Sequence, residues 1–205
     1  MGLLDQLTEK PWLASEDRAA ESRSRGAASL TAAQVGLRVF LAVATVIFTL
    51  FLGAYLERMT FGDWRPLSDP WILWVNTALL VLSSVAMQRA WTGADRGQID
   101  SVRNGLLAGG GFAFAFLAGQ AVAWQQLVAE GYFATSNVAN AFFYLVTAVH
   151  AVHLLGGLVA WARTTARVWQ GMEAAAVRGS VELCTVYWHF LLLVWLILFA
   201  LLLFT

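Results

Sequence analysis

The sequence has little charge for its length. Of its 205 residues, only 13% are Asp, Glu, Lys or Arg, while 59% are hydrophobic. Soluble domains carry about 25% charged residues, so this chain has roughly half the charge that a water-facing surface needs. The ten Trp and thirteen Phe point the same way. The composition excludes an ordinary soluble domain and predicts an integral membrane protein.

The sequence also has no excess of basic charge and only one cysteine. The formal net charge is zero, and no basic stripe is present to neutralise phosphates, which excludes a nucleic-acid partner. The single cysteine, Cys184, lies inside an apolar run. A disulfide framework is therefore excluded, and a cysteine-based metal cluster is disfavoured. We interpret Cys184 as a small hydrophobic residue within a helix.

Five apolar segments are long enough to cross a bilayer, which takes about 20 mostly apolar residues. They are Val35–Leu56, Trp71–Ala90, Asn104–Trp124, Val138–Ala162 and Ser180–Thr205. The polar stretch before the first segment has neither the short apolar core nor the cleavage pattern of a signal peptide, so we expect that segment to be retained. The sequence therefore predicts an all-α integral membrane protein, a bundle of five transmembrane helices.

The basic residues are distributed unevenly between the two sides of these segments. Only Arg58 and Arg65 fall on one side. The other side has Lys10, Arg18, Arg23, Arg25, Arg38, Arg89, Arg96, Arg103, Arg163, Arg167 and Arg178. Cationic loops remain in the cytoplasm, so we predict a cytoplasmic N-terminus and an external C-terminus, and tryptophans near the segment ends agree with these interfaces.

The first 33 residues differ in composition from the rest. Leu3, Leu4 and Leu7 are spaced for one face of a short helix, which predicts a stub on the membrane or on a partner. Residues 14–33 are rich in Ala, Ser and mixed charge, which predicts a linker. We expect a cytoplasmic arm over residues 1–33 and one transmembrane domain over residues 34–205.

Small residues gather in the third apolar segment. Gly105 and Gly109 form a GxxxG step, and Gly111, Ala115 and Gly119 extend it into a ridge. Small residues let helix backbones approach closely in lipid, where no hydrophobic force drives helices together. We expect this helix to be central and tightly packed.

Several polar side chains lie within the apolar segments, where ionisable groups are costly and normally turn inward toward partners. They are Asn76, Gln120, Thr147, His150, His153, Glu182 and His189. At about 100° per residue, Thr147, His150, His153 and Gly157 share one face of the fourth segment, and Glu182, Thr185 and His189 share one face of the fifth. We predict that these two faces meet, with His153 contacting His189 directly or through water.

Three roles fit this polar patch. We favour a structural role in which the side chains hold the helices together, and we assign no catalytic, cofactor-binding or metal-binding residue. A proton-related role is the second interpretation. A heme would need His189 together with a histidine of the fourth segment, and a metal site has no cysteine or carboxylate cluster to complete it. We interpret Glu182 as a carboxylate near a helix N-terminus, with a part in proton delivery left open.

The last segment reads Val-Glu-Leu-Cys-Thr-Val-Tyr-Trp-His-Phe over residues 181–190, with Trp195 six residues after the histidine. It resembles the signature of subunit III of the heme–copper respiratory oxidases, in which a Glu opens the last helix and a Tyr-Trp-His-Phe string follows. The paired histidines and glycines of residues 147–157 are similar to the family's preceding helix. Weaker likenesses are Trp64, Pro66, Asn76-Thr77, Ser83-Ser84, Gly119-Gln120 and Trp124.

The resemblance covers residues 35–205 and implies a non-catalytic subunit of a proton-pumping terminal oxidase. Such a subunit packs against subunit I beside subunit II, binds phospholipid, and supports proton uptake during oxygen reduction in a bacterial cytoplasmic membrane. Heme and copper belong to the partner subunits, and cytochrome c feeds the complex. The chain itself is expected to hold no cofactor.

The sequence departs from this family at two positions. Many members carry an acidic residue in the first of these five helices, but Val43, Ala44 and Thr45 stand there; many carry an Asp three residues after the histidine, but Leu192 stands there. Roles attached to those carboxylates cannot be transferred. The alternatives are a subunit of a quinol oxidase, a subunit III-like protein of a nitric oxide reductase and, outside the family, a membrane cytochrome b.

Overall fold

The computed structural model describes residues 11–62 and 71–203, and side chains from residue 32 onward. The chain divides into two units, one ending at Phe40 and the other beginning at Leu41. The predicted stub with Leu3, Leu4 and Leu7 lies outside the described residues. The account below concerns the unit Leu41–Thr205, apart from the backbone of the first helix.

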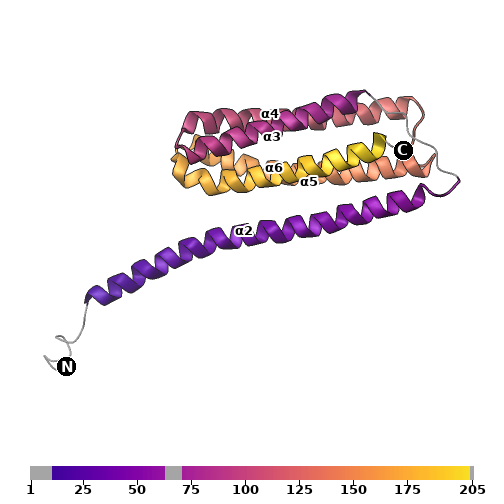
Figure 1. The fold of residues 1–205 in the computed structure, drawn as a ribbon. Coiled ribbons are helices and arrows are strands. Elements are labelled where there is room, and N and C mark those ends of the chain that lie inside the picture. Colours follow the sequence, from indigo (N-terminus) through magenta and orange to yellow (C-terminus); the bar gives the residue numbers. More distant parts are fainter. Residues whose placement is uncertain (1–10, 63–70, 204–205) are drawn as a thin grey trace. The chain divides into compact units, whose positions relative to one another are not determined.

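The described residues form long helices and no strand. Figure 1 labels them α2 (Pro11–Arg58), α3 (Ile72–Asp95), α4 (Ile99–Ala129), α5 (Val138–Trp169) and α6 (Ala174–Leu203). All five are long and apolar enough to cross a membrane, α2 through its part Ala32–Arg58. The all-α fold with five membrane-spanning helices is thus confirmed, whereas the orientation of the termini stays a prediction.

Helix α2 includes part of the predicted N-terminal arm. Residues 14–33, predicted as a linker, are helical and continuous with the first span. Alanine is the strongest helix former, so this composition suits a helix as well as a linker. The domain boundary at residue 33 stays a prediction.

Helices α3 to α6 form a four-sided bundle. Helix α3 packs against α4 and α6, and α5 packs against the same two helices. The middle of the bundle is filled by Phe116 from α4, His150 from α5, and Trp188 and Trp195 from α6, all fully buried. Helix α4 is therefore one side of the bundle, and the prediction that it is the central helix was wrong.

Two tight turns connect the helices at one end of this bundle. Gly97 after α3 and Gly171 after α5 have positive φ angles of 70° and 85°, which glycine adopts without a steric cost. Arg178 near the start of α6 pairs with Asp95 at the end of α3, with 2.6 Å between Nη2 and Oδ1. The two turns, with their arginines, therefore lie at the same end.

The second half of α2 joins the bundle through a few aromatic side chains. Phe48 is buried against Val146 of α5 and Val194 and Leu198 of α6. Other apolar side chains of this half, such as Val43, are exposed. Helix α2 thus offers lipid or a partner a largely uncovered apolar surface.

Candidate functional site

The polar side chains of α6 bond to α3 at several levels along the two helices. From one end of the contact to the other, the bonds are Thr185 Oγ1 to the Met87 carbonyl (3.1 Å), Trp188 Nε1 to Ser83 Oγ (2.8 Å) and Trp195 Nε1 to Thr77 Oγ1 (3.0 Å). In each bond the α6 side chain donates and α3 accepts. We call this set the α3–α6 ladder. It satisfies polar groups that would otherwise face hydrocarbon.

His189 belongs to the same contact. Its Nδ1 is hydrogen-bonded to Ser84 Oγ, and its Nε2 lies 2.8 Å from Gln88 Oε1. His153 instead places its Nδ1 2.8 Å from the Val149 carbonyl of its own helix. The predicted contact between His153 and His189 was therefore wrong, because the face of α6 that carries His189 is turned toward α3.

Helices α5 and α6 meet through other residues. Tyr187 donates its hydroxyl to the backbone carbonyl of His153 at 2.8 Å. The ring of Tyr187 lies where a side chain at Gly157 would stand, since a Cβ there would be 2.6 Å from its Cε1. Thr164 and Cys184 also lie within 3.5 Å of each other, Oγ1 to Sγ. Cys184 is buried, which agrees with a small hydrophobic role.

Ser83 connects three helices. It accepts the Trp188 indole hydrogen bond from α6 and donates its own hydroxyl to the Gly109 carbonyl of α4 at 2.6 Å. Both bonds are buried. A single hydroxyl, which can donate once and accept twice, thus ties α3, α4 and α6 together.

His150 occupies the centre of the bundle without a polar partner among the described residues. It is fully buried, and neither ring nitrogen has a hydrogen bond. Its ring centroid lies 5.3 Å from Trp195, 5.8 Å from Phe116 and 6.4 Å from Phe48. These are distances of aromatic packing, so His150 acts here as a core ring.

Thr147, Asn76 and Gln120 take part in two further polar contacts between helices. Thr147 donates to the Phe143 carbonyl at 2.6 Å and accepts from Trp124 Nε1 of α4 at 3.2 Å. Asn76 Nδ2 of α3 donates to Gln120 Oε1 of α4 at 3.2 Å. The Trp124–Thr147 and Asn76–Gln120 bonds each join α4 to a neighbouring helix, whereas the bond from Thr147 to Phe143 lies within α5.

Glu182 is half-buried and stands away from the start of its helix. Helix α6 begins at Ala174, so Glu182 is more than two turns inside it. The helix dipole acts within about the first turn. The interpretation of Glu182 as a helix N-terminal carboxylate was therefore wrong, because three alanines and the following residues extend the helix further toward the turn.

The small residues of α4 pack as predicted over only part of the ridge. A Cβ at Gly105 would lie 2.7 Å from the backbone nitrogen of Ala90, and one at Gly109 would lie 2.8 Å from Met87 Sδ. Gly119 likewise lies against the Asn76 side chain. Gly111 and Ala115 are exposed, and a Cβ at Gly111 would meet nothing within 4 Å. The predicted ridge is therefore interrupted, because those two residues lie on the outer face.

Sequence reasoning did not assign several of these contacts. Gly110 lies under the ring of Trp161, whose Nε1 donates to the Leu106 carbonyl at 2.8 Å. Trp161 lies near the end of its apolar segment, where a tryptophan is expected at the membrane interface. Its position in the sequence therefore did not indicate the contact with α4. Ser84 and Gln88 are four residues apart, a spacing that could have identified a second polar face on α3.

The donor set does not match a heme or a metal ion. A heme held between α5 and α6 needs His189 to face α5, yet both of its ring nitrogens are bonded to α3. In the described part of the chain, no group of three or more His, Cys, Asp or Glu is arranged to hold a metal ion. The arrangement is that of interhelical bonding.

Comparisons with known proteins give a consistent result. The family model described as cytochrome c oxidase subunit III matches residues 12–205. The chain is 28% identical to cytochrome c oxidase subunit 3 of Corynebacterium diphtheriae, covering 91% of this chain and 95% of that protein. It is 32% identical to the probable cytochrome c oxidase subunit 3 of Nocardia farcinica (81% and 84%) and 28% identical to the subunit 3 of Thermostichus vulcanus (82% and 85%).

Proposed function

The chain belongs to the cytochrome c oxidase subunit III family, and from that premise we propose that it stabilises subunit I of its oxidase and supports proton uptake there. It is one subunit of a terminal oxidase complex and a multi-pass membrane protein. The α3–α6 ladder carries the proposal, because its polar groups are used to bond helices. A rigid bundle of this kind suits a supporting subunit whose redox partners hold the heme and copper.

The exposed apolar surfaces support contacts with subunits I and II and with lipid. Helix α2 exposes Val43, Val46 and Leu50. An apolar pocket of about 120 Å³ lies between α2 and α6, lined among others by Phe48 and Leu193. Its walls suit an acyl chain, so we assign to it the binding of a phospholipid tail.

We also propose the membrane in which the chain lies and the electron donor of its complex. The relatives above come from bacteria, which supports a bacterial cytoplasmic membrane as the location. The arginines at the end with the two turns support placing that end in the cytoplasm. The names of these relatives include cytochrome c, which supports cytochrome c as the electron donor to the complex.

Co-purification tests this function. Tagged chain extracted from its native membrane is expected to bring subunits I and II with it, identified by mass spectrometry, and the preparation should show heme absorption. The chain expressed alone should show no Soret band. Recovery with a nitric oxide reductase or a quinol oxidase core, or a Soret band from the lone chain, would contradict the proposal.

Glu182→Gln provides a second test. The side chain is half-buried in α6 and takes no part in the α3–α6 ladder. We expect the complex to assemble normally and turnover to change by less than about twofold, which corresponds to less than about 0.4 kcal/mol in the barrier. Subunit recovery and oxygen-consumption rate measure the two effects. Loss of the complex would show that Glu182 is structural.

A further inference from the structure

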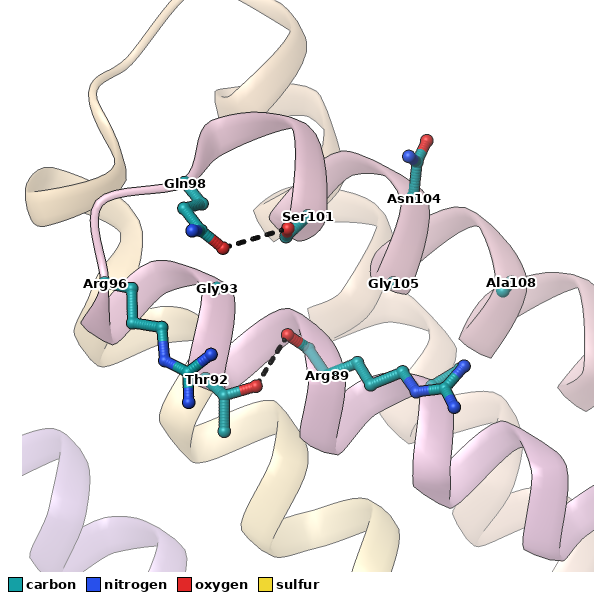
Figure 2. Close-up of a pocket in the computed structure, with 10 residues that line it drawn as sticks. Arg89, Thr92, Gly93, Arg96, Gln98, Ser101, Asn104, Gly105 and Ala108 are labelled. Atoms are coloured by element: carbon teal, nitrogen blue, oxygen red, sulfur yellow. Dashed lines mark hydrogen bonds between the residues drawn. The ribbon is translucent and has the colours of Figure 1, made fainter.

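A polar pocket lies on the outside of the bundle where α3 turns into α4 (Figure 2). Its volume is about 400 Å³, within the roughly 300–1,000 Å³ of small-molecule sites. Arg89, Thr92 and Arg96 come from the α3 side, and Gln98, Ser101 and Asn104 come from the α4 side. No polar contact described above involves this pocket.

The charge of the pocket has one sign. The lining residues include two arginines and, in the described part of the chain, no Asp or Glu. Neither Arg89 nor Arg96 has an ion pair among the described residues, whereas Arg178 at the same end is paired with Asp95. Two unneutralised guanidinium groups at one pocket favour an anionic ligand.

The neutral part of the lining suits a phosphate at one end and hydrocarbon at the other. The Gln98 amide nitrogen can donate a hydrogen bond near the turn, where Ser101 Oγ donates to Gln98 Oε1 at 3.3 Å, and Asn104 lies further along α4 beside Gly105. Ala86, Gly105 and Ala108 line the part of the pocket toward the middle of the helices. Arg89 and Arg96 are two helical turns apart, about 10 Å, so the cations extend along the pocket.

We propose that this pocket binds the headgroup phosphate of an anionic phospholipid, with Arg89 and Arg96 as its cationic ligands. The lipid tail leaves along Ala86 and Ala108 toward the bilayer interior. Arginines at a membrane interface attract anionic lipids, and a preformed pocket adds hydrogen bonds to that attraction. The inference deepens the phospholipid part of the proposed function and rests on it, but it concerns a site apart from the apolar pocket between α2 and α6.

The test compares two lipids with the same acyl chains on the delipidated, purified complex. Phosphatidylglycerol is anionic and phosphatidylcholine has no net charge, and native mass spectrometry counts the bound molecules of each. We expect a preference for phosphatidylglycerol of about tenfold, and its loss in Arg89→Gln/Arg96→Gln, because the charge-assisted bonds are removed. Equal binding of both lipids by the natural chain would overturn the proposal.

A matched control removes the same charge from the same end. Arg163→Gln/Arg167→Gln changes two arginines of α5 that do not line the pocket, and it should keep the preference. If both double variants lose it equally, the effect is general surface charge and the specific site is refuted. Arg96→Gln alone, at an exposed position, should lower the preference for phosphatidylglycerol by about threefold. This single variant replaces the double variant in the test if the double variant does not assemble.

Inorganic phosphate separates the two sources of the anion. Inorganic phosphate and a soluble glycerophospholipid are each added to compete with bound phosphatidylglycerol. If inorganic phosphate displaces the bound lipid as effectively as the soluble lipid does, the pocket holds free phosphate and the lipid assignment is wrong. We expect no displacement, because phosphate alone lacks the tail that the apolar part accepts. Recovery of subunits I and II from the same samples tests the proposed function separately, since a variant can lose the lipid preference and keep its partners.

Discussion

Gly105→Ala is expected to destabilise the chain by about 3 kcal/mol, the upper part of the usual range for overpacking a core. The new Cβ would lie 2.7 Å from the backbone nitrogen of Ala90 and 2.8 Å from the Ala86 carbonyl oxygen. Backbone atoms in the middle of a helix cannot move aside as a flexible side chain can, so α3 and α4 must separate. Reversible unfolding in detergent measures the loss of stability.

Gly111→Ala is the matched control for this substitution. It makes the same chemical change six residues further along the same helix, where the new Cβ would meet nothing within 4 Å. Alanine is also a better helix former than glycine by about 1 kcal/mol. This variant should therefore be as stable as the natural chain or slightly more so. Equal destabilisation by both variants would show that the close contact of α3 and α4 is not formed.

Trp188→Ala is expected to have a comparable effect, about 3–4 kcal/mol. The indole is fully buried, and its Nε1 donates to Ser83 at the junction of three helices. Truncation leaves a cavity in the α3–α6 contact and removes one step of the ladder. The expected result is a lower unfolding temperature of the chain in detergent and reduced recovery of its partner subunits.

Trp188→Phe separates packing from hydrogen bonding at this position, and Trp169→Ala is a control at an exposed tryptophan. Trp188→Phe keeps most of the ring and removes the bond, and interhelical bonds in membranes average about 0.6 kcal/mol, so its effect should be several times smaller. Trp169→Ala removes an indole that is 50% exposed at the end of α5, and it should leave the stability of the chain in detergent unchanged. A larger effect from Trp169 than from Trp188 would contradict the bundle described here.

Long apolar runs made the five spans predictable. A lipid-embedded backbone must satisfy its polar groups within the helix, so length and hydropathy alone locate a span. The helices α3 to α6 extend beyond the predicted segments because their charged ends, such as Asp95 and Arg167, continue the helix outside the apolar core. The linker role of residues 14–33 stays a prediction, because alanine with mixed charge suits both a helix and a linker.

The polar site was only half predictable. Helical periodicity correctly grouped Thr185 with His189, since both bond to α3. It could not identify that neighbour, because the angular spacing of residues along a helix says nothing about which other helix stands opposite. In the same way, the GxxxG step identified Gly105 and Gly109, but it could not show that Gly111 and Ala115 face outward.

The sequence by itself determined that this chain crosses a membrane five times, and its Tyr-Trp-His-Phe string pointed to the oxidase family. Only the tertiary structure decided that α6 bonds to α3, that Ser83 joins three helices, and that Arg89 and Arg96 share a pocket. The physical reason is the distance along the chain over which each effect acts. Transfer into lipid is a local property of each segment, whereas the pairing of polar groups depends on how four helices rotate against one another until donors meet acceptors.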